Sequence, residues 1–199
     1  MDVFQTGSGT STNMNANEVI ARRASQLLGA CPPDIHPNDH VNMGQSSNDV
    51  IPSAIHVAAL VAIERDLLPR LDMLVATLSR KAAEFDQVVK IGRTHLQDAT
   101  PIRLGQEFHA WAQQTAAEAG NVRRAGRSLS ELAMGGTAVG TGTNTHPEFG
   151  ARMAAELTTL TGFAFREASH HVAAQSYPQA IVAASAALHS LAAVLLKMA

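Results

Sequence analysis

Cysteine and aromatic residues are scarce in this sequence. Cys31 is the single cysteine among 199 residues, and Phe, Trp and Tyr together make up 4% of the chain. A single cysteine excludes a disulfide within the chain and a multi-cysteine zinc site. The same scarcity fits a reducing compartment, so we expect a cytoplasmic protein. The first ten residues, MDVFQTGSGT, also lack the basic and apolar regions of a secretory signal peptide.

Charge is sparse and balanced. The chain has 15 Lys and Arg residues against 17 Asp and Glu residues, which gives a formal net charge of -2. Nucleic-acid binding normally requires clustered positive charge, so we expect no nucleic-acid partner. The 46% of hydrophobic residues are enough to build a globular core.

One segment is apolar enough to raise the question of a membrane. Residues 180–196 are almost entirely apolar and approach the roughly 18 to 20 residues that a spanning helix needs. The segment is rich in Ala and Ser and contains His189, which is unfavourable in lipid. We therefore expect a helix buried inside a bundle, and no membrane partner.

The spacing of apolar residues predicts an all-α fold. They recur every three or four positions over long segments, which is the period of an amphipathic helix. Pro69 should kink or split the second of these segments, because proline removes a helical hydrogen bond. The first expected helix, 15–28, begins with a capping box of Asn15 and Glu18 and ends before Gly29. The second is 48–85, and the third follows Pro101. The fourth begins with a capping box of Thr145 and Glu148, and the last starts near Pro178 and is still apolar at Ala199.

Four polar clusters are the candidate sites for chemistry. Hydroxyl and amide donors beside the free N–H groups of a helix N-terminus favour an anion. Residues 46–48 fit this description best, although simple N-capping explains the same residue types. The four clusters are Ser8, Gly9 and Thr10; His36, Pro37, Asn38 and Asp39; Ser46, Ser47 and Asn48; and Thr94 and His95.

Histidines in or near these clusters have several interpretations. Histidine can take up or release a proton near neutral pH, so His95 is a candidate acid or base, with a structural role as the alternative. His36 and His40 are four residues apart and could bind a metal, but a third ligand is not evident. His170 and His171 are expected to be an exposed helix start. The glycine-rich segment 135–142 matches no nucleotide-binding motif and is interpreted as a tight turn.

Four segments of the sequence, taken in their order along the chain, form one pattern. They are QTGSGTSTNMNANEVIARRA, HPNDHVNMGQSSNDVIPSAIHVAA, KIGRTHLQDATPIRLGQEF and ELAMGGTAVGTGTNTHPEF. Through these segments the chain closely resembles the class II fumarases of the fumarase/aspartase superfamily over roughly residues 3–165. Ser8, Ser47 and His95 favour fumarases, since aspartase-like sequences usually have Ala, Thr and Gln there.

The resemblance implies an activity and a role for each cluster. The expected reaction is the reversible hydration of fumarate to L-malate, an enzyme activity of the citric acid cycle, without a metal or an organic cofactor. His95 resembles the catalytic histidine, and residues 36–39 resemble a second dicarboxylate site. Ser8, Gly9, Thr10, Ser46, Ser47, Asn48 and Thr94 resemble the contacts to the substrate carboxylates. The family also implies a bundle of long helices that assembles as a homotetramer.

Several family features are absent from these residues. A serine-containing loop of the pattern GSS-x-MP-x-K-x-N, which supplies a carbon base and a cation, does not occur in the 199 residues. Family members also have a sizeable region before QTGSGT, so we expect a fold truncated at both ends. Residues 1–45 would be the remainder of an N-terminal helical domain, and 46–199 part of the central long-helix bundle, ending within a helix. Pro33 stands where relatives often have a basic residue, which weakens the second site.

Two alternatives to a fumarase remain open at this point. The chain could belong to an aspartase-type ammonia-lyase of the same fold, or it could be a non-catalytic helical module. Because the serine loop is missing, we expect the isolated chain to be inactive or nearly so.

Overall fold

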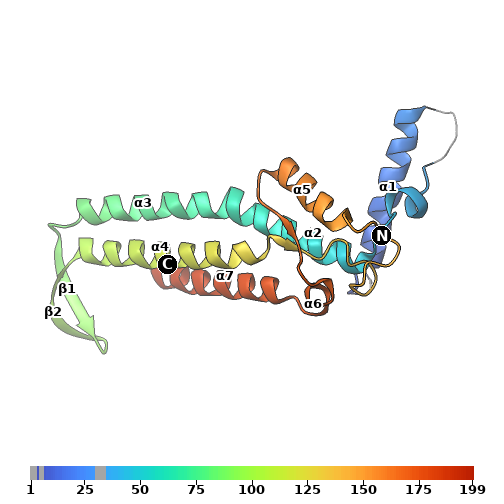
Figure 1. Ribbon diagram of the computed structural model, residues 1–199. Coiled ribbons are helices and arrows are strands. Elements are labelled where there is room, and N and C mark those ends of the chain that lie inside the picture. The colour runs from blue at the N-terminus through green and yellow to red at the C-terminus, as the bar shows by residue number, and fades with distance from the viewer. Residues whose placement is uncertain (1–3, 5–6, 30–34) are drawn as a thin grey trace. The chain divides into compact units, whose positions relative to one another are not determined.

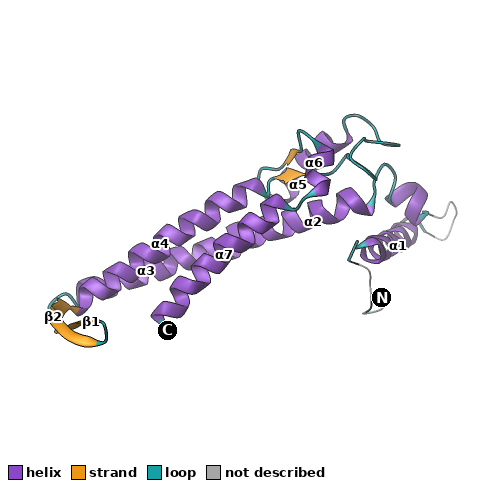
Figure 2. Cartoon of the chain, turned by 90° about the horizontal axis from the view of Figure 1, so that it is seen from below, coloured by secondary structure: helices purple, strands orange, loops and turns teal. Residues whose placement is uncertain are grey.

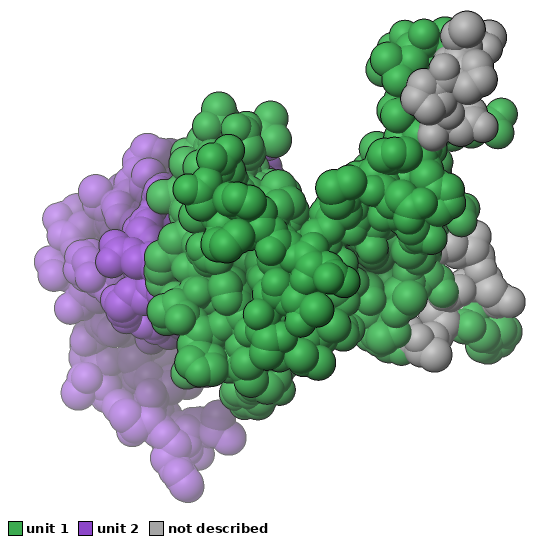
Figure 3. All heavy atoms as spheres, turned by 45° about the vertical axis from the view of Figure 1, so that its right-hand side comes forward, with its two compact units in different colours: residues 1–59, 129–179 green, residues 60–128, 180–199 purple. Residues whose placement is uncertain are grey.

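The computed structural model describes residue 4, residues 7–29 and residues 35–199. Cys31 and Pro33 lie outside these residues. The described chain is mainly helical, as predicted, and it divides into two compact units, which Figure 3 shows in different colours. One unit comprises residues 1–59 and 129–179, and the other comprises residues 60–128 and 180–199. The expected domain boundary after residue 45 stays a prediction.

The first unit is built from short helices and a long loop. Its elements are α1 (Thr10–Leu28), the π-helical segment η1 (Pro37–Val41), most of α2 (Ser47–Ala62), β3 (Glu131–Leu132), α5 (Phe149–Thr161), β4 (Arg166–Glu167) and α6 (His171–Ser176). β3 and β4 pair in parallel, which joins the two ends of the segment that contains α5. Leu129, Leu132 and Met134 are buried beside this pairing and form part of the unit's core.

The second unit is a pair of long antiparallel helices with further elements around it. It contains η2 (Ile63–Leu67), α3 (Leu68–Glu84), β1 (Val89–Thr94), β2 (Gln97–Arg103), α4 (Leu104–Ser128) and most of α7 (Gln179–Met198). Figures 1 and 2 show α3 and α4 side by side, with the β1–β2 hairpin joining their ends. The buried face between them is formed by Leu68, Leu71, Leu78, Ala82, Ala112, Thr115, Ala119 and Val122.

The predicted interruption at Pro69 is confirmed. Pro69 has no N–H group, and its ring would collide with the carbonyl of Arg65 in a regular α-helix. The five residues before α3 adopt a π-helical turn instead, in which the N–H of Leu68 bonds to the carbonyl of Ile63. Such a turn holds one extra residue, and it allows the helix from residue 47 to residue 84 to pass the proline.

The ends of α1 were predicted with mixed success. α1 ends at Leu28 with Gly29 as its C-cap, as predicted. It begins at Thr10, so the prediction of a capping box formed by Asn15 and Glu18 was wrong, and both side chains lie exposed within the helix. Gly9 precedes the helix in the left-handed conformation, with φ at 74°.

The predicted capping box before α5 was also wrong. The helix begins at Phe149, and the side chain of Glu148 at the N-cap position makes no capping hydrogen bond. His146 takes part in the turn instead, because its Nδ1 accepts a hydrogen bond from the N–H of Glu148 over 3.2 Å.

The β1–β2 hairpin was not expected from the helical pattern. Val89, Ile91 and Ile102 belong to strands whose side chains are mostly exposed, so no apolar stripe marks them. The pairing is irregular between Ile91 and Arg93, where β2 holds one extra residue. Gly92 permits this bulge, since a Cβ there would lie 2.8 Å from the carbonyl oxygen of Thr100.

α7 is exposed over most of its surface, whereas a buried bundle helix was expected. Ala184 and Leu191 are its only buried residues, and both lie on one side of the helix. By length and composition the helix could cross a membrane: its mean hydropathy is 1.8, and 11% of that segment is buried. A single helix of this kind is weak evidence for a membrane span. The other side of α7 is not covered by the described residues of this chain.

The close contact of α3 and α4 yields a stability prediction. A Cβ at Gly105 would collide with the carbonyl oxygen of Ala82 and lie 2.8 Å from the Cα of Asp86. Because both obstacles are backbone atoms, Gly105→Ala should destabilise the fold by about 1 to 3 kcal/mol. Thermal and urea unfolding followed by circular dichroism would measure the change.

Gly120→Ala is the matched control on the same helix. The nearest atom to a Cβ there is Nη1 of Arg124 at 3.6 Å, which belongs to a flexible side chain. Removing a glycine from a helix interior should therefore stabilise the protein by about 0.5 to 1 kcal/mol. Equal effects of the two substitutions would contradict the packing of α3 against α4.

Candidate functional site

Two of the predicted clusters meet at the start of α1 and α2. Thr10 is the first residue of α1, and its Oγ1 lies 3.2 Å from Oγ of Ser8 and 3.3 Å from Oγ of Ser47. Gly9 allows this approach, since a Cβ there would lie 2.7 Å from Cγ1 of Ile51. Three hydroxyl groups from segments 37 residues apart therefore form one chain of hydrogen bonds at the protein surface.

The N-terminus of α2 lies beside these hydroxyl groups. Oγ of Ser46 accepts a hydrogen bond from the N–H of Asn48 over 3.2 Å, and Oδ1 of Asp49 accepts one from the N–H of Ser46 over 3.0 Å. This reciprocal pair is a capping box with aspartate as its acid. The alternative interpretation as an N-cap therefore holds for Ser46, whereas Ser47 is the residue that joins the hydroxyl chain.

Asn48 and Asp49 connect α2 to the glycine-rich segment 135–142. Nδ2 of Asn48 donates to the carbonyl oxygen of Ala138 over 2.8 Å. Oδ2 of Asp49 accepts hydrogen bonds from the N–H groups of Gly135 at 3.2 Å and Thr137 at 2.8 Å. The glycine-rich segment is thus a tight turn, as interpreted from the sequence, and it also forms a wall beside the start of α2.

Asp49 is the residue that the sequence reasoning missed. Its side chain is fully buried, and its oxygens bond to main-chain groups that lie up to 88 residues away. A local signal was available, because Ser46 and Asp49 are spaced as a capping box. No local pattern could have indicated the two bonds to the glycine-rich turn.

The predicted second site forms the short segment η1. His36 precedes the segment, and its Nδ1 accepts from the N–H groups of Asn38 at 3.3 Å and Asp39 at 3.2 Å. Nδ1 of His40 accepts from the N–H of His36 over 2.8 Å. Both histidines therefore use one ring nitrogen to hold the local backbone. The residues described by the structure contain no group of three or more His, Cys, Asp or Glu arranged to hold a metal ion.

Asn42 ties this segment to α1. Its Oδ1 accepts hydrogen bonds from Nδ2 of Asn13 at 3.2 Å and from Nδ2 of Asn17 at 3.1 Å. Asn13 and Asn17 are four residues apart on one side of the helix, and both are buried. The amide groups position η1 against the helix that begins at Thr10.

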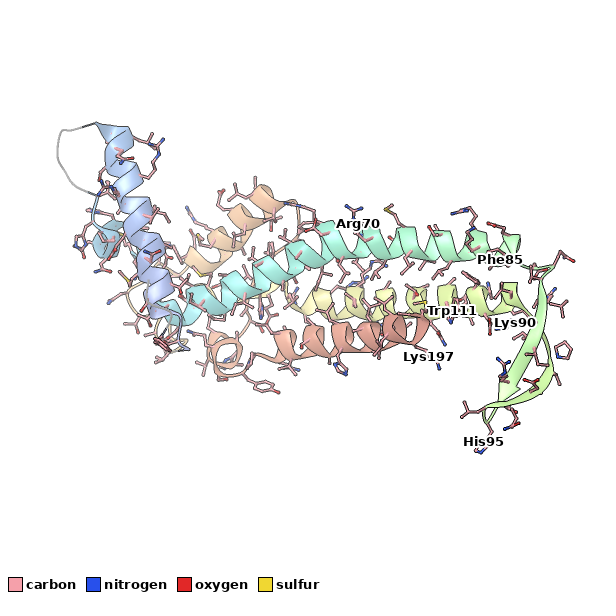
Figure 4. The ribbon with its side chains drawn as sticks, turned by 180° about the vertical axis from the view of Figure 1, so that it is seen from behind. Arg70, Phe85, Lys90, His95, Trp111 and Lys197 are labelled. Carbon is pink, nitrogen blue, oxygen red and sulfur yellow. The ribbon has the colours of Figure 1, made fainter. Side chains whose placement is uncertain are left out.

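Thr94 and His95 belong to the second unit and lie in the β1–β2 hairpin. Thr94 pairs with Gln97, so His95 and Leu96 form a two-residue turn. Figure 4 shows His95 at the tip of the hairpin, away from the aromatic residues Phe85 and Trp111. An ion pair of 3.1 Å between Nε of Arg93 and Oδ1 of Asp98 joins the strands below the turn.

The turn at His95 is conformationally unfavourable. His95 has φ at 48° and Leu96 has φ at 61°, which is a left-handed conformation that side chains with a Cβ rarely adopt. Turns of this kind usually contain Asn-Gly or a similar pair. The side chain of Leu96 is 94% exposed, so local packing does not compensate for the strain.

The two adjacent histidines of α6 have different environments. His170 is the N-cap residue of α6, and its Nδ1 accepts from the N–H of Ala173 over 3.3 Å. Both histidines were predicted to be exposed, and the prediction was wrong for His171, which is partly buried. Its Nε2 lies 3.0 Å from the carbonyl oxygen of Met134 and 3.2 Å from Oε1 of Glu167. His171 and Glu167 line a cavity of about 300 Å³ beside the glycine-rich turn.

The strain in the hairpin turn leads to a prediction. Leu96→Gly removes the side chain that disfavours the left-handed conformation and should stabilise the protein by about 0.5 to 1 kcal/mol, after the entropy of glycine in the unfolded chain is subtracted. Leu96→Ala keeps a Cβ and should have almost no effect. Urea unfolding measures both, and destabilisation by Leu96→Gly would show that the leucine side chain supports the turn.

The whole chain, residues 1–199, matches a family described as lyase. A class II fumarate hydratase of Halobacterium salinarum is 60% identical over 178 residues, which is 88% of this chain and 38% of that protein. The class II fumarate hydratase of Nitrosomonas europaea is 54% identical over 200 residues, covering 99% of this chain and 43% of that protein. The chain thus spans about two fifths of the length of these curated relatives.

Solved structures show the same fold. The crystal structure of class II fumarase from Schistosoma mansoni matches with a TM-score of 0.95 at 36% identity, over 100% of this chain and 45% of that chain. A fumarate lyase:delta crystallin from Brucella melitensis, crystallised with cobalt, matches with a TM-score of 0.93 at 42% identity, over 100% and 44%. The chain therefore belongs to the lyase family, and the two curated relatives described above are class II fumarate hydratases.

Proposed function

We propose that this chain carries the carboxylate-binding residues and the catalytic histidine of a fumarate hydratase, which interconverts fumarate and L-malate. The observation that supports the proposal most is the convergence of Ser8, Thr10 and Ser47 in one hydroxyl chain at the start of two helices. Helix N-termini and hydroxyl groups both favour a carboxylate. In the first unit, Gly9, Ser46 and Asn48 are further proposed substrate contacts, and residues 36–39 are proposed as the second dicarboxylate site. In the second unit, Thr94 is proposed to contact a substrate carboxylate.

The reaction explains why donors are gathered at a carboxylate. Dehydration of malate removes a proton from the carbon beside one carboxylate and a hydroxyl group from the neighbouring carbon. Loss of that proton puts further negative charge on the adjacent carboxylate, which preorganised donors stabilise. His95 is proposed to exchange a proton with the leaving hydroxyl group or the attacking water.

The neutral donors of this chain supply only part of that stabilisation. Ser, Thr and Asn bind and orient the carboxylate, but the reaction also needs a base for the carbon-bound proton and a cation beside the developing charge. The sequence contains no GSS-x-MP-x-K-x-N pattern to provide them. The chain by itself is therefore proposed to bind a dicarboxylate without turning it over.

Binding is tested by titrating the isotope-labelled chain with fumarate and following its amide resonances by NMR. The resonances of residues 8–10 and 46–48 should shift together and saturate, and fumaramide, which has the same shape without the charges, should leave them unchanged. Ser47→Ala should weaken fumarate binding by about 1 to 3 kcal/mol, because a donor to a charged group is lost. Shifts elsewhere with none at these residues would refute the proposed site.

Turnover is tested by following fumarate absorbance after addition of L-malate, with L-aspartate in a parallel reaction. Neither substrate should yield fumarate with this chain alone. Fumarate from aspartate and none from malate would instead establish an ammonia-lyase. Robust turnover of malate would overturn the proposal that the chain lacks a necessary base and cation.

Self-association is proposed as well. In the second unit, Met73 on α3 and Val182 and Leu196 on α7 are at least half exposed, and apolar helix faces of this kind are usually covered by a partner. We propose a homo-oligomer, with a tetramer as the expected state, in the cytoplasm. Sedimentation velocity should detect species larger than the 21.0 kDa chain, and a purely monomeric chain would count against the proposal.

A further inference from the structure

The carboxylate of Asp49 is bonded entirely to main-chain N–H groups. The side chain is 0% exposed, and its oxygens accept from Ser46, Gly135 and Thr137 at 3.0, 3.2 and 2.8 Å. A buried carboxylate is stable only when such donors replace the water that it has lost. These bonds hold the start of α2 against a turn that lies 86 to 88 residues later in the sequence.

The turn needs this support because its backbone is strained. Thr137 has φ at 57°, a left-handed conformation that costs roughly 1 kcal/mol or more for a residue with a Cβ. Its N–H bonds to Asp49, and its carbonyl oxygen accepts from Nε2 of Gln175 over 2.7 Å. The two bonds therefore hold Thr137 from both sides of the residue.

Ala138 follows the strained residue and presents its carbonyl oxygen to Asn48. Nδ2 of Asn48 donates to that oxygen over 2.8 Å, although the Asn48 side chain is otherwise exposed. An exposed asparagine normally rotates freely, and a hydrogen bond to a fixed carbonyl restricts the rotation. One amide N–H of Asn48 is used in this way, and the amide has a second N–H that can bind a ligand.

We infer that Asp49 is a positioning residue of the carboxylate site, which acts by holding the glycine-rich turn so that Ala138 orients the amide of Asn48. The inference rests on the proposed function, in which Asn48 contacts a substrate carboxylate. The inference adds Asp49, a buried acid that does not contact the substrate. Asp49 determines the orientation of Asn48, which is proposed to contact it. Asp49 acts through the turn and Asn48, and takes no part in proton transfer.

A double-mutant cycle tests the inference in this chain. The variants are Asp49→Asn, Asn48→Ala and the double variant, and the measurement is the dissociation constant of succinate, an unreactive dicarboxylate. In Asp49→Asn, the side-chain NH₂ can take the place of Oδ2. The N–H groups of Gly135 and Thr137 would then face a hydrogen-bond donor and lose their acceptor. Each single variant should weaken succinate binding about tenfold, and the double variant also about tenfold, because both remove the same oriented amide.

An additive outcome would overturn the inference. If Asp49 only stabilised the fold, its effect would be independent of Asn48, and the double variant would bind about a hundredfold more weakly than the unmodified chain. Ser53→Ala is the matched control, because Ser53 is on the same helix, is 3% exposed, and its Oγ has no hydrogen-bond partner among the described residues. It should leave succinate binding unchanged.

A second measurement separates this inference from the proposed function. The side-chain NH₂ resonances of Asn48 should shift in Asp49→Asn, and the N–H groups of Gly135 and Thr137 should exchange faster, with no ligand present. If the unmodified chain fails to bind succinate, the proposed binding role fails, and unchanged Asn48 resonances would in addition overturn the positioning role. If Asp49→Asn does not fold, Gln175→Leu decides, because it removes the other bond to Thr137 and should shift the same Asn48 resonances.

Discussion

A single buried carboxylate links the parts of the first unit on which the candidate site depends. Asp49 accepts one hydrogen bond from the turn before its own helix and two from the glycine-rich turn. Without Asp49, the N–H groups of Gly135 and Thr137 would be buried donors that have lost this partner, which is costly in a protein interior. The bonds at Asp49 therefore satisfy the start of α2 and fix a turn that contains four glycines, a segment with little side-chain material of its own to pack.

The second unit is held by a different principle, which is the close approach of two helices through small residues. Gly105, Ala112 and Ala119 on α4 leave room for α3, and Thr115 directs its hydroxyl group to the carbonyl of Trp111 within its own helix. Phe85, Phe108 and Trp111 close the end of this pair near the hairpin, with ring centroids 4.9 to 5.1 Å apart. The hairpin that carries His95 thus starts from a rigid base, while its tip projects with little support.

The positions of most helices and of the polar clusters could be predicted from the sequence. The hydrogen bonds that connect distant segments could not. The apolar period located the helices that end at Leu28 and Glu84, and Pro69 was sufficient to locate the π-helical turn. Capping patterns were less reliable, because Asn15 and Thr145 have the residue types of a cap without occupying one. The same spacing at Ser46 and Asp49 does form a capping box in the structure. Local spacing alone cannot distinguish these cases, since the deciding partners of Asp49 are 86 and 88 residues away.

The bulge opposite Gly92 determines the number of residues in the hairpin loop. Had the pairing of Ile91 with Pro101 continued without the extra residue in β2, Thr94 would face Asp98, and the loop would hold three residues instead of two. The bulge shortens the loop from three residues to two, so that Arg93 faces Asp98 and the turn consists of His95 and Leu96 alone. The left-handed conformation of His95 in this short turn therefore depends on the bulge opposite Gly92, three residues earlier in the chain.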